Sequence, residues 1–150
     1  INAIVNIRDE MTSANIANII HNGSNIKSEI NVKHILHDKA HGVFEVKSTI
    51  NNKASKSKVF QSSKTTLLSD DARIDAQPQL LILTDNLEAK HSATCGAINE
   101  EELYYLISRG IPLEKAQTML IESIEIDIIE KIENKIVRDF VIKYKGKNNV

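Results

Sequence analysis

The spacing of apolar positions along the chain changes near residue 98. Before that point, short apolar segments rich in Val, Ile and Thr alternate with turns rich in Asn, Asp, Ser and Gly, which is typical of β-strands. After it, apolar residues recur every three or four positions, as on one face of an α-helix. The pattern predicts a mainly β fold over residues 1–98, followed by a small helical subdomain and tail over residues 99–150.

The β part shows a weak internal repeat. Ala54, Ala72 and Ala89 each follow a polar turn and are almost evenly spaced along the sequence. Coils of that length suit a parallel β-helix, in which small residues stack from coil to coil, whereas an irregular sandwich is the alternative. The predicted strands are Glu29–Leu36, Gly42–Ile50, Ser57–Gln61, Thr65–Leu68, Ala72–Ile74, Leu80–Thr84 and Leu87–His91.

Two helices of the second part are predicted from their ends. Asn99 followed by Glu102 is a variant of the capping box, which satisfies the first free N–H groups of a helix. Gly110 provides a left-handed stop for this helix. Pro112 opens the next helix, where its missing N–H costs nothing.

The second of these helices carries a broad apolar arc within Leu113–Ile132, which needs burial on more than one side. We expect part of this arc to pack against Leu103, Leu106 and Ile107 of the first helix. A third segment around Phe140 has helical spacing, although a strand is also compatible with its pattern.

Composition narrows the class of protein. The chain has 19 basic and 20 acidic side chains and a net charge of −1, which argues against a nucleic-acid partner. No segment is long enough for a membrane span, and no signal peptide opens the sequence, so no membrane partner is expected. The single cysteine, Cys95, cannot form an internal disulfide, which is typical of a reducing compartment.

Histidines and the cysteine are the candidate metal ligands. His34, His37 and His41 have a spacing that would suit a metal site on a helix, but their context predicts strand, turn and strand. We interpret them as scattered surface histidines. His91 and Cys95 lie four residues apart and together could contribute to a site for a soft metal. Two ligands do not complete a site, and an ordinary histidine with a half-buried thiol is the alternative.

Clustered aspartates suggest a hypothesis from the enzyme class. Asp70, Asp71 and Asp75 would lie at turns of a β-helix, as the acidic residues of β-helix polysaccharide lyases and hydrolases do. Aspartate is also favoured at turns because it forms local hydrogen bonds there. The sequence contains no phosphate-binding loop, nucleophile elbow or HExxH motif.

Two long motifs carry the most specific signal in the sequence. Residues 67–80 read LLSDDARIDAQPQL, and residues 90–111 read KHSATCGAINEEELYYLISRGI. The second motif is similar to the pattern SHGATVGxLDEExLFYLxSRGI, and KAHGVF at residues 39–44 is similar to KARGVF. Both patterns are those of the SufB/SufD family of iron–sulfur cluster assembly proteins, which the chain resembles over Lys39–Ile132.

The resemblance implies a right-handed parallel β-helix, of which residues 1–98 are the C-terminal portion, followed by a helical subdomain. Family members are longer, so an N-terminal portion would be missing, as the start at Ile1 also suggests. The implied function is a non-catalytic scaffold in the bacterial cytoplasm or a plastid-type organelle.

The resemblance also implies the partners. A SufC-like ATPase would bind the helical subdomain, and a SufB-like scaffold, or a second copy, would pair through the edge of the β-helix. ATP-driven dimerisation of the SufC-like ATPase would then rearrange the scaffold interface and expose the site of the nascent cluster. The candidate ATPase-binding residues on the helices are Glu101, Tyr104, Tyr105, Arg109 and Glu114.

The motifs favour SufD over SufB, with a SufB-like paralogue as the alternative. No cysteine lies around Lys64, and Ser92 rather than Glu follows His91. His91 matches the SufD histidine at the scaffold interface that is proposed to help hold the cluster. The cysteine often found two residues earlier is Ala89 here, and Cys95 is a possible accessory thiol. We therefore expect no cluster bound stably by this chain alone, and an iron–sulfur cluster held transiently in the complex.

Overall fold

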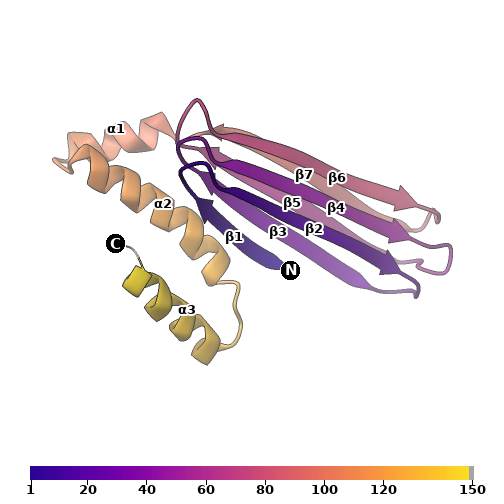
Figure 1. Ribbon diagram of the computed structural model, residues 1–150. Coiled ribbons are helices and arrows are strands. Elements are labelled where there is room, and N and C mark those ends of the chain that lie inside the picture. The colour runs from indigo at the N-terminus through magenta and orange to yellow at the C-terminus, as the bar shows by residue number, and fades with distance from the viewer. Residues whose placement is uncertain (149–150) are drawn as a thin grey trace. The chain divides into compact units, whose positions relative to one another are not determined.

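The computed structural model describes residues 1–148, with side chains as far as Lys145, so residues 149–150 of the predicted tail lie outside it. The chain forms a β unit that extends to Ala97 and a helical unit that begins at Ile98. Figure 1 shows the elements, which in chain order are β1 (Asn2–Ile7), β2 (Thr12–His21), β3 (Lys27–Leu36), β4 (His41–Ile50), β5 (Ser57–Leu67), β6 (Arg73–Ile82), β7 (Leu87–Ala97), α1 (Glu100–Ser108), α2 (Leu113–Ile129) and α3 (Lys135–Asn148).

The β unit is a parallel β-helix of two facing sheets. The odd-numbered strands form one sheet in the order β1-β3-β5-β7, and the even-numbered strands form the other in the order β2-β4-β6. The chain therefore changes sheet at every turn, and each strand pairs in parallel with the strand one coil later. This confirms the predicted β-helix and removes the irregular sandwich.

The predicted coil length is wrong. Thr12 pairs with His41 and His41 pairs with Arg73, so one coil contains a strand from each sheet and is nearly twice as long as the predicted repeat. Ala40 and Ala72 are the true equivalents, because both pack beside Leu36 at one corner. Ala54 packs at a different place, beside Ile50 and Val59. The spacing between Ala54 and Ala72 therefore approximates half a coil.

The predicted strands were too short, and two pairs of them are single strands. Ser57–Gln61 and Thr65–Leu68 belong to the continuous strand β5, and Ala72–Ile74 and Leu80–Thr84 fall largely within β6. Strands β1 and β2 were not predicted. Polar residues within these strands interrupt the apolar pattern, yet the parallel ladder extends through them.

The interior of the β-helix contains both apolar and polar side chains. Phe44 is fully buried, and Val32 and Val46 lie in the same core cluster. His34 is 0% exposed, so its assignment to the surface was wrong. Its Nε2 lies 3.1 Å from Asn15 Oδ1 and donates to it, which leaves Nδ1 without a described hydrogen-bond partner.

Gly42 explains part of the KAHGVF motif. A Cβ at this position would lie 2.7 Å from Ile74 Cδ1, which would have to shift, and 3.2 Å from Leu36 Cδ1, a tight contact. Gly42 therefore allows the side chains of neighbouring strands to meet inside the coil.

The helical unit begins and ends its first helix as predicted. The Asn99 side chain accepts hydrogen bonds from the backbone N–H groups of Glu101 and Glu102. Gly110, at a φ of 85°, adopts the left-handed conformation that ends the helix. The third segment is the helix α3 rather than a strand. None of the helices within the described residues is long and apolar enough to cross a bilayer.

We expect burial of His34 to make the β-helix less stable in mild acid. Desolvation lowers the pKa of His34 from 6.5 to about 4, so the unfolded chain takes up a proton between these values that the folded chain refuses. Stability should therefore be complete above pH 6.5 and should fall by up to roughly 3 kcal/mol as the pH approaches 4. Urea unfolding across this range should show a steeper pH dependence for the native chain than for His34→Gln.

Val32→Ala is the matched control, because it removes buried atoms from the same interior but no titratable group. This control should keep the native pH dependence. Equal slopes for the native chain and His34→Gln would contradict the burial argument.

Candidate functional site

The β-helix has an open end at its last coil. Strands β6 and β7 are the final strands of their sheets, so one edge of each has no partner strand among the described residues. On β5, the inward-facing Gln61, Ser63 and Thr65 are buried, whereas their register partners on β7 are exposed. These exposed partners are His91, Ala93 and Cys95.

His91 reaches across this open end from one sheet to the other. Its Nδ1 lies 3.2 Å from the carbonyl oxygen of Pro78 on β6 and donates a hydrogen bond to it. Pro78 has no N–H to offer a ladder, which suits its position on an edge strand. In the neutral imidazole this hydrogen bond places the proton on Nδ1 and the lone pair on Nε2, and no hydrogen-bond partner of Nε2 is found among the described residues.

Gln61 repeats this arrangement one coil earlier, and sequence reasoning missed it. It is the register partner of His91, and its Nε2 donates to Ser48 Oγ at 2.7 Å and to the carbonyl oxygen of Gln79 at 3.2 Å. Its Oε1 is buried and has no described partner. In the sequence, Gln61 is marked only as a polar residue between two apolar stretches of β5. Such a residue can lie either in the interior or in a turn, so the sequence does not predict its burial.

Cys95 lies on the same face of β7 as His91, within the strand rather than at a junction with a helix. It is exposed, so the prediction of a half-buried thiol was wrong. Residues four apart on a strand are separated by about 13 Å, whereas two ligands of one metal lie within a few ångströms of each other. His91 and Cys95 of one chain therefore cannot share a metal ion.

The other predicted clusters do not converge. His34 is interior, His37 lies in the turn after β3, and His41 Nε2 lies 2.8 Å from Asp75 Oδ2 on the outer surface. Asp70 and Asp71 lie on the turn between β5 and β6. No group of three metal-ligating side chains is present within the part of the chain that the structure describes.

The outer face of β7 is tied to β5 by charge. Lys58 Nζ lies 3.1 Å from Glu88 Oε2, and this contact lowers the pKa of Glu88. Lys90 contributes to the same effect from the next outward position on β7. The last strand thus has an outer face that is fastened to its neighbour, while its inner face is open.

The candidate ATPase-binding residues lie in the helical unit. Tyr104 is 66% exposed, and Glu101 and Glu114 are exposed as well. The guanidinium carbon of Arg109 lies 5.2 Å from the centre of the Tyr105 ring, a cation–π contact that holds the two side chains together. Four of the five residues therefore belong to α1 and its C-cap, and Glu114 lies in the first turn of α2.

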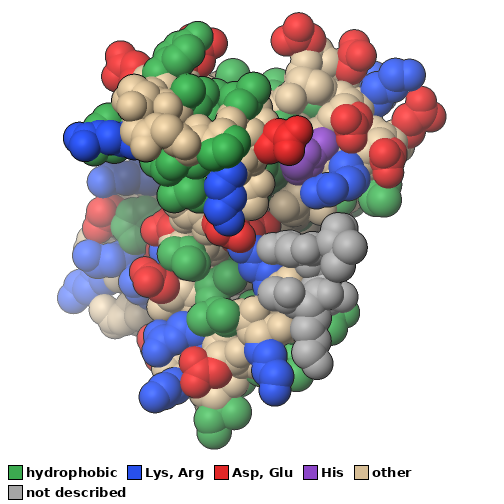
Figure 2. Space-filling model, turned by 90° about the vertical axis from the view of Figure 1, so that its left-hand side faces the viewer, with side chains coloured by type: hydrophobic (Ala, Val, Ile, Leu, Met, Phe, Trp, Pro, Cys, Tyr) green, Lys and Arg blue, Asp and Glu red, His purple; other side chains and the backbone are tan. Residues whose placement is uncertain are grey.

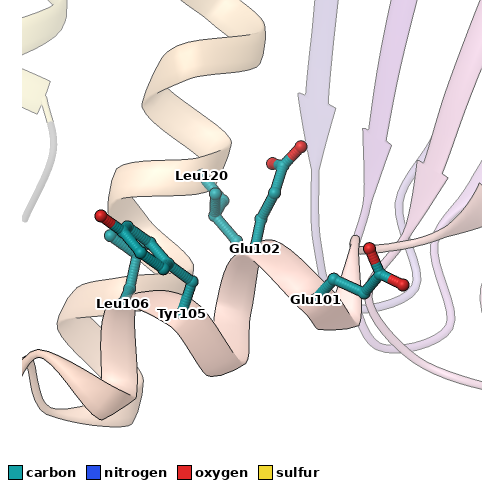
Figure 3. Close-up of a pocket in the computed structure, with 5 residues that line it drawn as sticks. All are labelled: Glu101, Glu102, Tyr105, Leu106 and Leu120. Carbon is teal, nitrogen blue, oxygen red and sulfur yellow. The ribbon is translucent and has the colours of Figure 1, made fainter.

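A groove of about 360 Å³ lies between α1 and α2. Leu106 and Tyr105 from α1 and Leu120 from α2 supply its apolar lining (Figure 3). Glu101 and Glu102 add two carboxylates, and the Glu102 side chain extends beside Leu120. Glu102 Oε1 also accepts a hydrogen bond from Asn99 Nδ2, so the cap of α1 positions one wall of the groove.

Residues 1–124 match the family described as SUF system FeS cluster assembly, SufBD core domain. The iron–sulfur cluster assembly protein SufD of Bacillus subtilis is 39% identical over 114 residues, which are 76% of this chain and 26% of that protein. SufD of Escherichia coli is 31% identical over 114 residues, covering 76% of this chain and 27% of that protein. Protein ABCI7, chloroplastic, of Arabidopsis thaliana is 31% identical over 105 residues, or 70% of this chain and 22% of that protein. The chain thus spans about a quarter of the length of these relatives.

We expect Asn99→Ala to loosen α1 and with it the surface that carries Tyr104 and Tyr105. Loss of the side-chain cap should cost about 1 kcal/mol, because two N–H groups lose their acceptor. Hydrogen exchange of the α1 amides should accelerate about fivefold. Asn134→Ala, which removes the equivalent cap from α3, should accelerate exchange in α3 and leave α1 unchanged. The cap argument fails if both variants affect the two helices alike.

Proposed function

The chain belongs to the SufB/SufD family, and we propose that it acts as a SufD-like, non-catalytic scaffold in iron–sulfur cluster assembly. The observation that carries this proposal is the open end of the β-helix, where unpaired strand edges surround His91. The bacterial and chloroplastic relatives support a place in the bacterial cytoplasm or a plastid-type organelle.

The first part of the proposal is that β6 and β7 pair with a SufB-like scaffold. Unpaired backbone edges favour the addition of further strands, and apolar side chains around them favour burial. Leu81, Ile82 and Leu83 at the end of β6 are exposed, large and apolar. Pairing would bury these side chains and satisfy the free edge groups in one step.

The second part concerns His91, which we propose as a ligand for the nascent cluster, the cargo of the complex. Histidines that bind metals commonly donate their other ring N–H to a carbonyl oxygen, which fixes the ring orientation. His91 has this arrangement, with Nδ1 on the Pro78 carbonyl and Nε2 free to ligate. Because Cys95 is too distant to join it, the remaining ligands would come from the partner, and binding by this chain alone would be weak.

The third part is that a SufC-like ATPase docks on the surface formed by Glu101, Tyr104, Tyr105, Arg109 and Glu114. Exposed tyrosines and an arginine are the residue types that dominate binding energy at protein interfaces. ATP-driven movement of the ATPase would then be transmitted to the scaffold interface and expose the cluster site.

Ala93→Glu should weaken pairing with the SufB protein of the same organism by about tenfold or more. Ala93 faces the open end, so pairing would bury the new charge without a partner, while the unpaired chain leaves it in water. Thr94→Glu is the matched control, because Thr94 is exposed on the outer face of the same strand. Isothermal titration calorimetry distinguishes them, and equal affinities for the two variants would contradict pairing through this end.

Tyr104→Ala should weaken binding of the SufC ATPase from the same organism by about tenfold or more, because it removes an exposed aromatic anchor. Met11→Ala removes an exposed apolar side chain from the β unit and should leave ATPase binding unchanged. Surface plasmon resonance with immobilised ATPase gives both affinities. Retention of full affinity by Tyr104→Ala, or absence of binding by the native chain, would contradict docking through α1.

A further inference from the structure

Helix α3 presents an exposed apolar ridge. Ile136, Phe140 and Tyr144 recur every four residues and so share one face of the helix. They are 81%, 66% and 62% exposed, and the rings of Phe140 and Tyr144 stack with their centres 6.2 Å apart. We call these three residues the α3 ridge. A row of large exposed apolar side chains on one helix face is a candidate interaction surface.

The α3 ridge points away from α2. Lys145 forms an ion pair with Glu125 of α2, and Arg138 Nη1 donates to the carbonyl oxygen of Ile132. With about 100° between successive residues, Arg138 and Lys145 lie on the side of α3 opposite the ridge. These two contacts, one to α2 and one to the segment after it, therefore lie on the side of α3 away from the ridge.

The charge on α3 limits what can cover the ridge. From Lys135 to Lys145 the helix carries four cations, which are Lys135, Arg138, Lys143 and Lys145, and one acid, Asp139, a net charge of +3. Helix α3 lies in the lower part of Figure 2, where hydrophobic side chains reach the surface among Lys and Arg side chains. Pairing of two α3 helices would bring like charges together, so the complementary surface must be acidic as well as apolar.

The groove between α1 and α2 has this chemistry. Its lining by Tyr105, Leu106 and Leu120 is apolar, and Glu101 and Glu102 place two carboxylates beside it. Its volume of about 360 Å³ is sufficient for one or two aromatic side chains. Lys143 next to the ridge and Glu101 next to the groove are both exposed, and neither forms an ion pair within the described residues.

We propose that the α3 ridge of one chain docks into the α1–α2 groove of a second copy. Phe140 and Tyr144 would pack on Leu106 and Leu120, while Lys143 would face Glu101. Each chain carries both surfaces, and reciprocal exchange of the two α3 contacts would close the assembly as a dimer of the isologous type.

This docking has a regulatory consequence that rests on the proposed function. Glu101 and Tyr105 belong both to the groove and to the surface proposed for the ATPase. Self-docking and ATPase binding then exclude each other, so the ATPase dissociates the α3-mediated dimer. Self-docking of two copies does not depend on whether the chain also binds an ATPase.

Sedimentation velocity of the full chain over a concentration series tests the proposal. Phe140→Glu should raise the dimer dissociation constant by about tenfold or more, because a charge replaces the central anchor of the ridge. Ile16→Glu is the control, since Ile16 on β2 is a similarly exposed apolar side chain in the β unit, which carries neither the ridge nor the groove. It should leave dimerisation unchanged.

Charge reversal gives a second, independent test. Glu101→Lys and Lys143→Glu should each weaken the dimer, and the double variant should recover most of the native affinity because the pair is restored with opposite polarity. A chain that is monomeric at every concentration overturns the proposal, as does a monomer whose ridge binds phosphatidylserine vesicles. A dimer insensitive to Phe140→Glu also overturns it and indicates pairing through the β-helix edge instead. ATPase binding by the Phe140→Glu monomer would support the proposed function whether or not self-docking occurs.

Discussion

The parallel backbone ladder between successive coils is the constraint on which the β unit depends. Each strand shares its N–H and C=O groups with the strand one coil later, so the register between coils fixes which side chains face inward. The last strand of each sheet has no following coil with which to share its remaining N–H and C=O groups among the described residues. Where the stacking stops, at β6 and β7, backbone groups on the outer edges have no partner strand among the described residues, and inward-facing side chains of β7 are exposed. The candidate site lies at this end of the ladder, and the strands themselves position its residues.

The same constraint explains why polar residues are found inside the coils. A side chain at an inward position must be buried whatever its chemistry, so Gln61 and His34 find hydrogen-bond partners across the interior. His91 is the register partner of Gln61 one coil later. It also donates a hydrogen bond to the opposite sheet, but at the open end of the β-helix. Inside the stack such a side chain would only connect the two sheets. At the open end it is also accessible, and for His91 we propose that it binds the cluster.

The sequence predicts much of this architecture, and its errors have physical causes. The capping box at Asn99 and the stop at Gly110 are local signals, and they predict both ends of α1 correctly. Strand β2 was missed because it alternates Ala and Asn with Ile and lacks a continuous apolar run. The coil length was misjudged because turns at different corners of the coil carry the same polar-then-Ala pattern. Burial of His34 and the role of Gln61 depend on which strand lies one coil away, and local spacing does not contain that information.

The unpaired edges of β6 and β7 are the surface through which we propose that this chain enters a scaffold complex. Hydrogen exchange of the chain, alone and with a SufB protein from the same organism, tests this most directly. The account predicts that amides of β6 and β7 exchange faster than those of β4 and β5 in the free chain, and that the SufB protein slows β6 and β7 selectively. Protection confined to other strands, or no change in β6 and β7 on complex formation, would contradict it.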